Sequence, residues 1–177
     1  MDVLPDVLKP GLKVVFCGTA TGNRSAIIGA YYAGRGNQFW AVLHRVGLTP
    51  CQLQPQQYRS LLSYGIGLTD LVKSVSGNDN ILVGKLGKLF DIAGFRQRLE
   101  NAAPKALAFN GKRVAMEFLG RPVKYGLQPE RVESSTVFIL PSTSGAAQVY
   151  WNEQYWLELA EYIGQYDNSD ATQVPNK

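Results

Sequence analysis

The residues best suited to chemistry in this sequence are one carboxylate and two groups of hydroxyls. Asp70 ends an apolar segment, where an ionised carboxylate can orient a water molecule or accept a proton. A helix cap or a surface ion pair after the segment is the other interpretation of Asp70. The hydroxyls lie in two loops and can hold water, bind a phosphate or bond to neighbouring backbone. They belong to Thr19, Thr21, Ser25, Ser142, Thr143 and Ser144.

The composition excludes several other kinds of site. Two cysteines and a single histidine, His44, are too few for a cysteine-rich zinc site or a four-cysteine iron–sulfur cluster. We therefore expect no metal and no cofactor. A net charge of +4 permits DNA binding without demonstrating it. No apolar run reaches the roughly 20 residues that a membrane helix needs, and the first residues lack a signal-peptide pattern. We expect a cytoplasmic monomer without a membrane segment.

The elements that position these residues alternate along the chain. At 177 residues and 45% hydrophobic, the chain can bury the core of one domain. Short β-rich apolar runs predict four strands, at 12–17, 66–72, 105–109 and 136–140. Helical spacing and cap residues predict helices at 37–46, 55–62, 85–101, 112–119 and 151–166. The alternation predicts a three-layer α/β/α sandwich with a central, mostly parallel four-stranded sheet.

The predicted domain spans residues 1–166, and we expect the polar segment 167–177 to be a disordered tail. In a parallel sheet, ligands bind in loops beyond the carboxyl ends of the strands. Three loops meet that description: those starting at Gly18, near Asp70 and at Pro141. Between Thr19 and Gly36 the chain has a long stretch without an expected element. A stretch of that length inside a compact domain is usually functional.

At these loops the sequence resembles the mismatch-specific uracil-DNA and thymine-DNA glycosylases of the uracil-DNA glycosylase superfamily. The similarity covers about residues 8–165, in segments that agree in order and spacing. These segments are residues 9–18 (KPGLKVVFCG), 32–40 (YAGRGNQFW), 67–72 (GLTDLV) and 104–112 (PKALAFNGK), and Leu140-Pro141 precedes the final loop as in the family. The resemblance implies that the protein flips a base, expected to be uracil, out of DNA and hydrolyses its N-glycosidic bond, leaving an abasic site.

The chain departs from the family at the chemical centre. The family's first motif reads Gly-Ile-Asn-Pro-Gly, and its Asn holds the attacking water. This chain has Ala20 at that position, and Ala20 has no polar atom. In the family's final motif, Asn-Pro-Ser-Gly-Leu-Ser-Arg, the wedge Leu and the Arg correspond here to Ala146 and Gln148. We therefore expect activity on uracil in single strands as well as in duplexes.

The resemblance assigns candidate roles to individual residues. The catalytic candidates are Asp70, Thr19, Ala20 and Ser142. The base-binding candidates are Gly18, Thr21, Tyr32 and Asn110. The DNA-binding candidates are Ser25, Ser144, Gly145, Ala146, Gln148 and Lys112. Tyr32 corresponds to the aromatic residue on which the flipped base stacks, although it could also be a core tyrosine. Asn110 and Asn37 could instead be helix caps. Lys73, Arg113 and Arg24 could touch phosphates or lie on a solvated face.

Two further hypotheses stay open beside the glycosylase. Loss of the water-holding Asn allows a non-catalytic protein that binds lesions or abasic sites on the same scaffold. A small-molecule nucleotide-binding α/β protein is the third. If the protein is an enzyme, we expect it to be monofunctional. A lyase needs an amine nucleophile, and the base-facing motifs contain no lysine.

Overall fold

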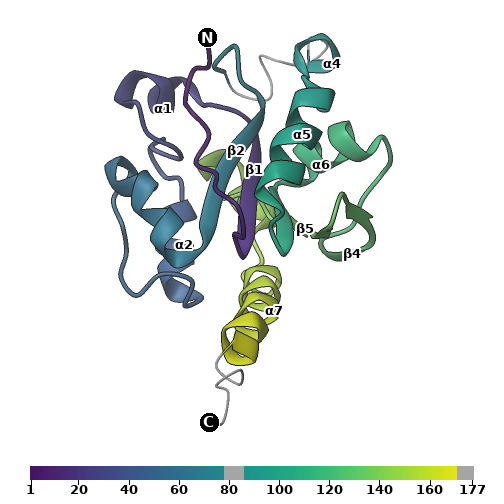
Figure 1. The fold of residues 1–177 in the computed structure, drawn as a ribbon. Coiled ribbons are helices and arrows are strands. Elements are labelled where there is room, and N and C mark those ends of the chain that lie inside the picture. The colour runs from purple at the N-terminus through teal and green to yellow at the C-terminus, as the bar shows by residue number, and fades with distance from the viewer. Residues whose placement is uncertain (78–85, 171–177) are drawn as a thin grey trace, which may run out of the picture.

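A five-stranded sheet forms the centre of the computed structural model, which describes residues 1–77 and 86–170 (Figure 1). Its strands are β1 (Val14–Ala20), β2 (Ile66–Val72), β3 (Ala106–Asn110), β4 (Gly126–Val132) and β5 (Ser135–Leu140), in the order β2-β1-β3-β5-β4. The pairs β1–β2, β1–β3 and β3–β5 are parallel, whereas β4 pairs antiparallel with β5. The prediction of a mostly parallel sheet is confirmed, but the sheet has a fifth strand.

The unexpected strand β4 lies at the edge of the sheet. In an edge strand apolar side chains usually face the core and polar ones face solvent. Here the apolar Leu127 is 58% exposed and the polar Gln128 is buried. Gln128 satisfies its amide inside by donating to the carbonyls of Lys124 and Gly126, both at 2.9 Å. A register shift between Leu127 and Arg131 brackets Pro129, which an edge strand tolerates. The segment therefore lacks the apolar run that marked the other strands.

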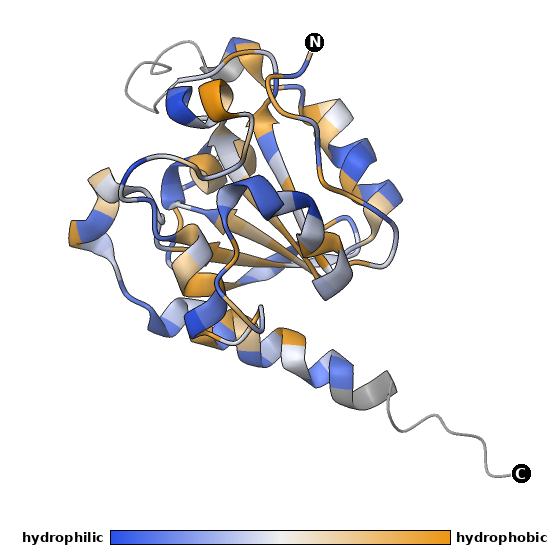
Figure 2. Ribbon diagram, turned by 90° about the vertical axis from the view of Figure 1, so that its left-hand side faces the viewer, coloured by the Kyte–Doolittle hydropathy of each residue, from blue (hydrophilic) through white to orange (hydrophobic). Residues whose placement is uncertain are grey.

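Helices cover both faces of the sheet, as the three-layer prediction requires. They are α1 (Asn23–Ile28), α2 (Phe39–Arg45), η1 (Pro55–Tyr64), α4 (Leu86–Leu89), α5 (Ile92–Ala102), α6 (Lys112–Leu119), η2 (Gly145–Tyr150) and α7 (Gln154–Asp170). One apolar core joins α2, η1 and α7 to the sheet face that carries Phe16 and Leu68. The second core joins α5 and α6 to the opposite face, which carries Leu107 and Ile139. Figure 2 shows hydrophobic residues concentrated along the central strands.

Several helix boundaries differ from those expected. The long stretch after β1 contains the short helix α1. The helix expected at 85–101 is divided into α4 and α5, because Asp91 caps α5 by accepting from the Gly94 N–H at 2.8 Å. Helix α7 continues to Asp170, past the expected end at Tyr166, and 171–177 of the predicted tail lie outside the described residues. None of the helices described has the length and apolarity needed to span a membrane.

Candidate functional site

A cleft of about 980 Å³ opens at the carboxyl ends of the parallel strands. It is lined by the loop that follows β1, by part of the loop before α2, by the start of α6 and by the final loop with η2. The candidate site residues named from the sequence line this cleft, with the exception of Gln148. The tertiary structure therefore brings together segments that are far apart in the sequence.

Asp70 and Gly18 face each other across neighbouring strands at the cleft. They are register partners in the parallel pair β1–β2. Asp70 is only 3% exposed. A Cβ added at Gly18 would lie 2.6 Å from the Asp70 Oδ1, closer than such atoms approach. Glycine at position 18 therefore makes room for the Asp70 carboxylate.

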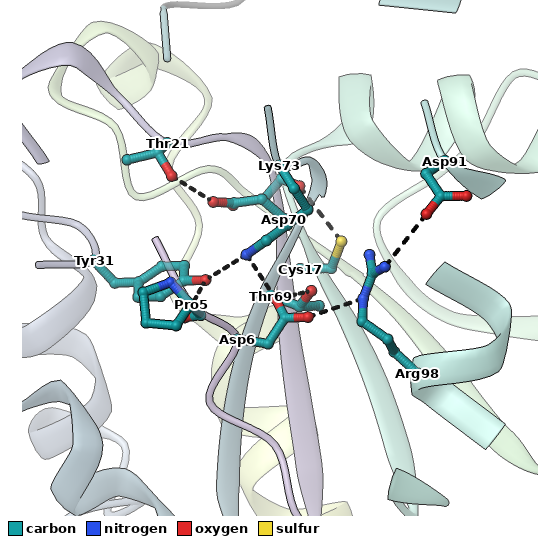
Figure 3. Close-up of polar contacts among 11 residues, drawn as sticks. Pro5, Asp6, Cys17, Thr21, Tyr31, Thr69, Asp70, Lys73, Asp91 and Arg98 are labelled. Atoms are coloured by element: carbon teal, nitrogen blue, oxygen red, sulfur yellow. Dashed lines mark hydrogen bonds and ion pairs between the residues drawn. The ribbon is translucent and has the colours of Figure 1, made fainter. Parts of the chain in front are cut away.

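Thr21 orients that carboxylate. Its hydroxyl donates a hydrogen bond to the Asp70 Oδ2 at 3.1 Å, and both side chains are buried (Figure 3). The backbone carbonyl of Thr21 accepts from the Gly77 N–H at 3.0 Å, which ties the loop after β1 to the chain after β2. The Asp70 carboxylate is thus bound by a side chain of the loop after β1, and this loop is itself fixed to the chain after β2. The negative charge of Asp70 also adds to the effect of burial in raising the pKa of the nearby Cys17 thiol.

Tyr32 lies beside this carboxylate in the same cleft. Its ring stacks on Phe39, with the centroids 4.0 Å apart and the planes at 26°. The Tyr32 hydroxyl is buried and lies 3.5 Å from the position of a Cβ at Gly18. Burial raises the pKa of this phenol, and the charge of Asp70 raises it further, while the Asn110 side chain opposes them. Tyr32 therefore stays neutral at physiological pH.

Asn110 fixes the final loop against the end of β3. Its side-chain N–H donates to the Thr143 hydroxyl at 2.9 Å, and its carbonyl accepts from the Thr143 N–H at 3.0 Å. The Thr143 carbonyl in turn accepts from the Gln38 N–H at 2.9 Å. Gly145 packs against the loop before α2, where an added Cβ would lie 3.3 Å from the Gly36 carbonyl oxygen. These contacts hold the two sides of the cleft together.

The serine hydroxyls in these loops are engaged with neighbouring backbone. Ser25 accepts from the Ala33 N–H at 2.9 Å and is buried. Ser142 accepts from the Ser144 N–H at 3.2 Å, and Ser144 caps η2 by accepting from the Ala146 N–H at 3.4 Å. Asn37 also bonds locally, but it is not the expected N-cap: Gln38 holds that position, and the Asn37 side chain, one residue earlier, accepts from the Phe39 N–H at 3.0 Å. Of the partners expected for these hydroxyls, the structure shows neighbouring backbone groups.

Basic side chains line the cleft, but Lys73 is not one of them. Arg24, Arg35, Lys112 and Arg113 lie along it, and Asp70 is the one acidic residue among the described residues that line it. The side chain of Lys73 is 9% exposed and pairs with Asp6 at 2.7 Å. It also donates to the Tyr31 hydroxyl at 3.1 Å. A phosphate contact by Lys73, which the sequence left open, is not compatible with this burial.

The Lys73 ion pair belongs to a second polar cluster, on the outer side of β2. Asp6 lies in the N-terminal segment, which pairs with β2 through the Val7–Leu68 bridge. Its carboxylate accepts from the Thr69 hydroxyl at 2.8 Å and pairs with Arg98 at 2.9 Å. Figure 3 shows this cluster below Asp70, with Lys73 directed toward Asp6 and Tyr31. Sequence reasoning missed it because its members lie far apart along the chain.

Other residues of the cleft were also missed. Tyr125, Met116 and Tyr150 line it together with the arginine Arg35. An aromatic residue two positions after the candidate Gln148 was the feature of the sequence that could have pointed to Tyr150. Within the described ranges, 1–77 and 86–170, no group of histidine, cysteine and carboxylate side chains is arranged to hold a metal ion. The cleft thus offers a carboxylate, an aromatic ring and basic side chains.

Comparison with known proteins assigns this arrangement to a family. The fold is similar to the solution NMR structure of a proposed uracil DNA glycosylase from Methanosarcina acetivorans, with a TM-score of 0.62. The two chains are 20% identical over 91% of this chain and 96% of that one. The family model described as the uracil DNA glycosylase superfamily matches residues 5–163, which include both sides of the cleft. The chain therefore belongs to the uracil DNA glycosylase superfamily.

Proposed function

We propose that this protein is a monofunctional uracil-DNA glycosylase. Membership of the superfamily supports DNA glycosylase chemistry in base-excision repair, and the cleft supplies groups suited to it. In this reaction the bond between the base and the sugar breaks and its electron pair leaves with the base. Water then adds to the sugar carbon and loses a proton, leaving an abasic site.

The observation that carries the proposal is the buried Asp70 carboxylate at the cleft, oriented by Thr21 and accommodated by Gly18. Positive charge develops on the sugar as the bond breaks, and a carboxylate beneath it stabilises that charge. The same carboxylate can orient the attacking water and accept its proton. General-base catalysis of this kind contributes about 10²–10⁴-fold in rate. Asp70 thus takes over the role for which Ala20 has no polar atom.

Tyr32 is the proposed platform for the flipped base. Its ring lines the cleft and is backed by Phe39, so that it is held rigidly. Stacking on an aromatic ring contributes about 1–3 kcal/mol and accepts any base. Backbone N–H groups at residues 19–22 are the proposed donors to the base oxygen. Asn110 acts by positioning, because both ends of its amide are bound to Thr143.

We propose a monofunctional reaction because a lyase needs an amine nucleophile and the proposed mechanism uses water instead. Lys112 is the one lysine among the described residues that line the cleft, and its ammonium lies 4.2 Å from the centroid of the Tyr125 ring. We further propose a monomer in the cytoplasm, in contact with the nucleoid if the cell is bacterial. Neither a metal nor a cofactor enters the proposed mechanism.

The test is a gel assay on labelled oligonucleotides that contain one uracil, under single-turnover conditions, for U·G, U·A and single-stranded substrates. We expect a strand break only after alkali treatment, which reports an abasic site. Cleavage without alkali would indicate a lyase and contradict a monofunctional reaction. Tight binding of uracil or abasic DNA without base release would instead support the non-catalytic binding protein that Ala20 makes conceivable.

Ala146 and Ala147 lead to a further expectation in the same assay. A bulky wedge fills the gap that a flipped base leaves in a duplex, and these residues supply little bulk. We therefore expect comparable rates on U·G, U·A and single-stranded substrates. A strong preference for U·G with no cleavage of single strands would overturn this part of the proposal.

A further inference from the structure

One flank of the cleft carries aromatic and cationic side chains that the proposed reaction does not use. We call Lys112, Arg113, Tyr125 and Tyr150 the tyrosine flank; all four line the cleft. We propose that this flank binds an unpaired nucleotide next to the damaged one in single-stranded DNA, with its base on Tyr150 and its phosphate at Lys112 and Arg113. The inference rests on the proposed action on DNA and adds a second base-binding subsite.

Tyr150 is the exposed aromatic surface of the flank. It ends η2 and is 66% exposed, whereas Tyr31 and Tyr58 are 2% and 6% exposed. The neighbouring Val149, at 82% exposed, does not line the cleft. Burial of an aromatic ring against a base removes a large apolar area from water, so an exposed ring in a cleft favours a stacking ligand.

Tyr125 forms the fixed base of the flank. The Lys112 ammonium lies 4.2 Å from its ring centroid, and the Tyr155 ring packs against it at 5.4 Å. Burial raises the pKa of Tyr125, and the neighbouring phenols of Tyr150 and Tyr155 raise it further. Tyr150 lines the same cleft as Tyr125. Tyr125 is occupied by its neighbours, which leaves Tyr150 as the ring that can take a base.

The charge of the cleft selects an anionic ligand. Four of its described lining residues are cationic and one, Asp70, is acidic. Lys112 and Arg113 open helix α6, and neither forms an ion pair within residues 1–77 and 86–170. The Arg113 Nε is buried without a hydrogen-bond partner there. A row of cations beside an exposed aromatic ring is the pattern with which proteins bind single-stranded nucleic acid.

The same features argue against a paired duplex as the ligand of this subsite. Bases inside a duplex are stacked on each other, so their faces are not available to Tyr150. Opening a duplex there requires a side chain that fills the gap, and the loop presents Ala146 and Ala147. A single strand needs no such filler. The occupant is therefore an unpaired nucleotide.

The experiment compares Tyr150→Ala, Tyr150→Phe and the adjacent control Val149→Ala. For the wild type and each variant, the affinity is measured for single-stranded and duplex oligonucleotides that contain a tetrahydrofuran abasic analogue. The fluorescent base 2-aminopurine is placed on the 5′ or the 3′ side of the analogue. The analogue is not a substrate, so binding is measured independently of excision. We expect 2-aminopurine on one side of the single strand to be quenched by the wild type. Tyr150→Ala should weaken single-strand binding about 5- to 150-fold and abolish that quenching.

Tyr150→Phe and Val149→Ala should bind single strands like the wild type, and the melting temperatures should agree because both positions are exposed. Unchanged single-strand affinity of Tyr150→Ala would overturn the proposal, as would an equal or larger loss on the duplex. A uracil gel assay on the same proteins separates the two proposals. If uracil is excised but Tyr150→Ala changes nothing, the subsite proposal is wrong and the glycosylase proposal stands. If single strands bind through Tyr150 but no uracil is excised, the glycosylase proposal is wrong and the subsite proposal stands.

Discussion

Two largely buried carboxylates lie close to strand β2 and have opposite surroundings. The Asp6 side chain, 15% exposed, pairs with Lys73 and Arg98 and accepts from the Thr69 hydroxyl. Asp70, one residue after Thr69, turns to the other face of the strand, lines the cleft and accepts from Thr21. Successive side chains of a strand point to opposite faces. Adjacent positions of one strand can therefore serve a structural ion-pair cluster and a candidate active site.

The difference shows how the role of a buried carboxylate follows from its surroundings. Asp6 joins the N-terminal segment, β2 and α5. Removing it would take the carboxylate partner from the buried Lys73 and leave Arg98 with only its 3.7 Å contact to Asp91. Asp70 lies where a ligand can reach it. We therefore expect Asp6 to matter for stability and Asp70 for reaction rate. The following predictions separate the two, starting with the largest effect.

Asp70→Asn should lower the single-turnover rate of uracil release by about 10²–10⁴-fold, because the amide cannot accept a proton from water. It keeps the shape of the side chain, so the melting temperature should change little. Rates are read from the alkali gel assay and stability from thermal melting. If the rate is unchanged while the free energy of unfolding falls by about 1 kcal/mol, Asp70 is a structural group like Asp6, and the proposed difference between the two carboxylates is wrong.

Asp6→Asn should show the opposite pattern. Breaking a buried ion pair by removing one partner costs about 3 kcal/mol, since Lys73 and Arg98 keep their charges. The rate measured well below the melting temperature should equal that of the wild type. Glu153→Gln serves as the control, because the Glu153–Arg45 pair is exposed and its loss should cost under about 1 kcal/mol. A large loss of rate in Asp6→Asn would mean that the two clusters act together.

Gly18→Ala should displace the Asp70 carboxylate, since the added Cβ would lie 2.6 Å from its Oδ1. A misplacement of about 1 Å in a catalytic group can cost about 10²-fold in rate. Gly34→Ala, at another glycine that lines the cleft, is the matched control, because its Cβ would meet no atom within 4 Å. Equal single-turnover rates for the two variants would show that the position of Asp70 is not critical.

Tyr32→Ala should weaken capture of the flipped uracil by about 1–3 kcal/mol, because the stacking ring is lost. Tyr32→Phe keeps the ring on Phe39 and should retain most of the affinity. The measurements are DNA affinity and single-turnover rate for both variants. Wild-type values for Tyr32→Ala would rule out Tyr32 as the platform and leave the Asp70 side of the cleft without its proposed base site.

Thr21→Val should have the smallest effect, about tenfold in rate, because it removes the one hydrogen bond that the Thr21 hydroxyl gives to Asp70. Thr21→Ser keeps a hydroxyl and should recover most of that loss. The comparison uses the same gel assay, with melting curves to detect any change in stability. A rate that is the same for Val and Ser would show that Asp70 is oriented by other groups.

The sequence by itself was sufficient for the family, the layers and the loops of the cleft. Its apolar runs marked β1, β2, β3 and β5, because strands buried on both faces need continuous apolar residues. The position of Asp70 near the carboxyl end of such a run placed it close to the edge where ligands bind. Strand β4 was not predicted because it lies at the sheet edge with an exposed leucine and a buried glutamine. At such a position contacts with neighbouring elements outweigh local strand preferences.

Only the tertiary structure decided which side chains meet. The contacts of Asp70 with Gly18 and Thr21, of Asn110 with Thr143, and of Asp6 with Lys73 and Arg98 all join residues at least 33 positions apart in the sequence. Local propensity contains no information on such pairs, because they depend on strand order and register. The sequence determined which residues could do chemistry; the packing of β1, β2 and the N-terminal segment determined which carboxylate faces the cleft.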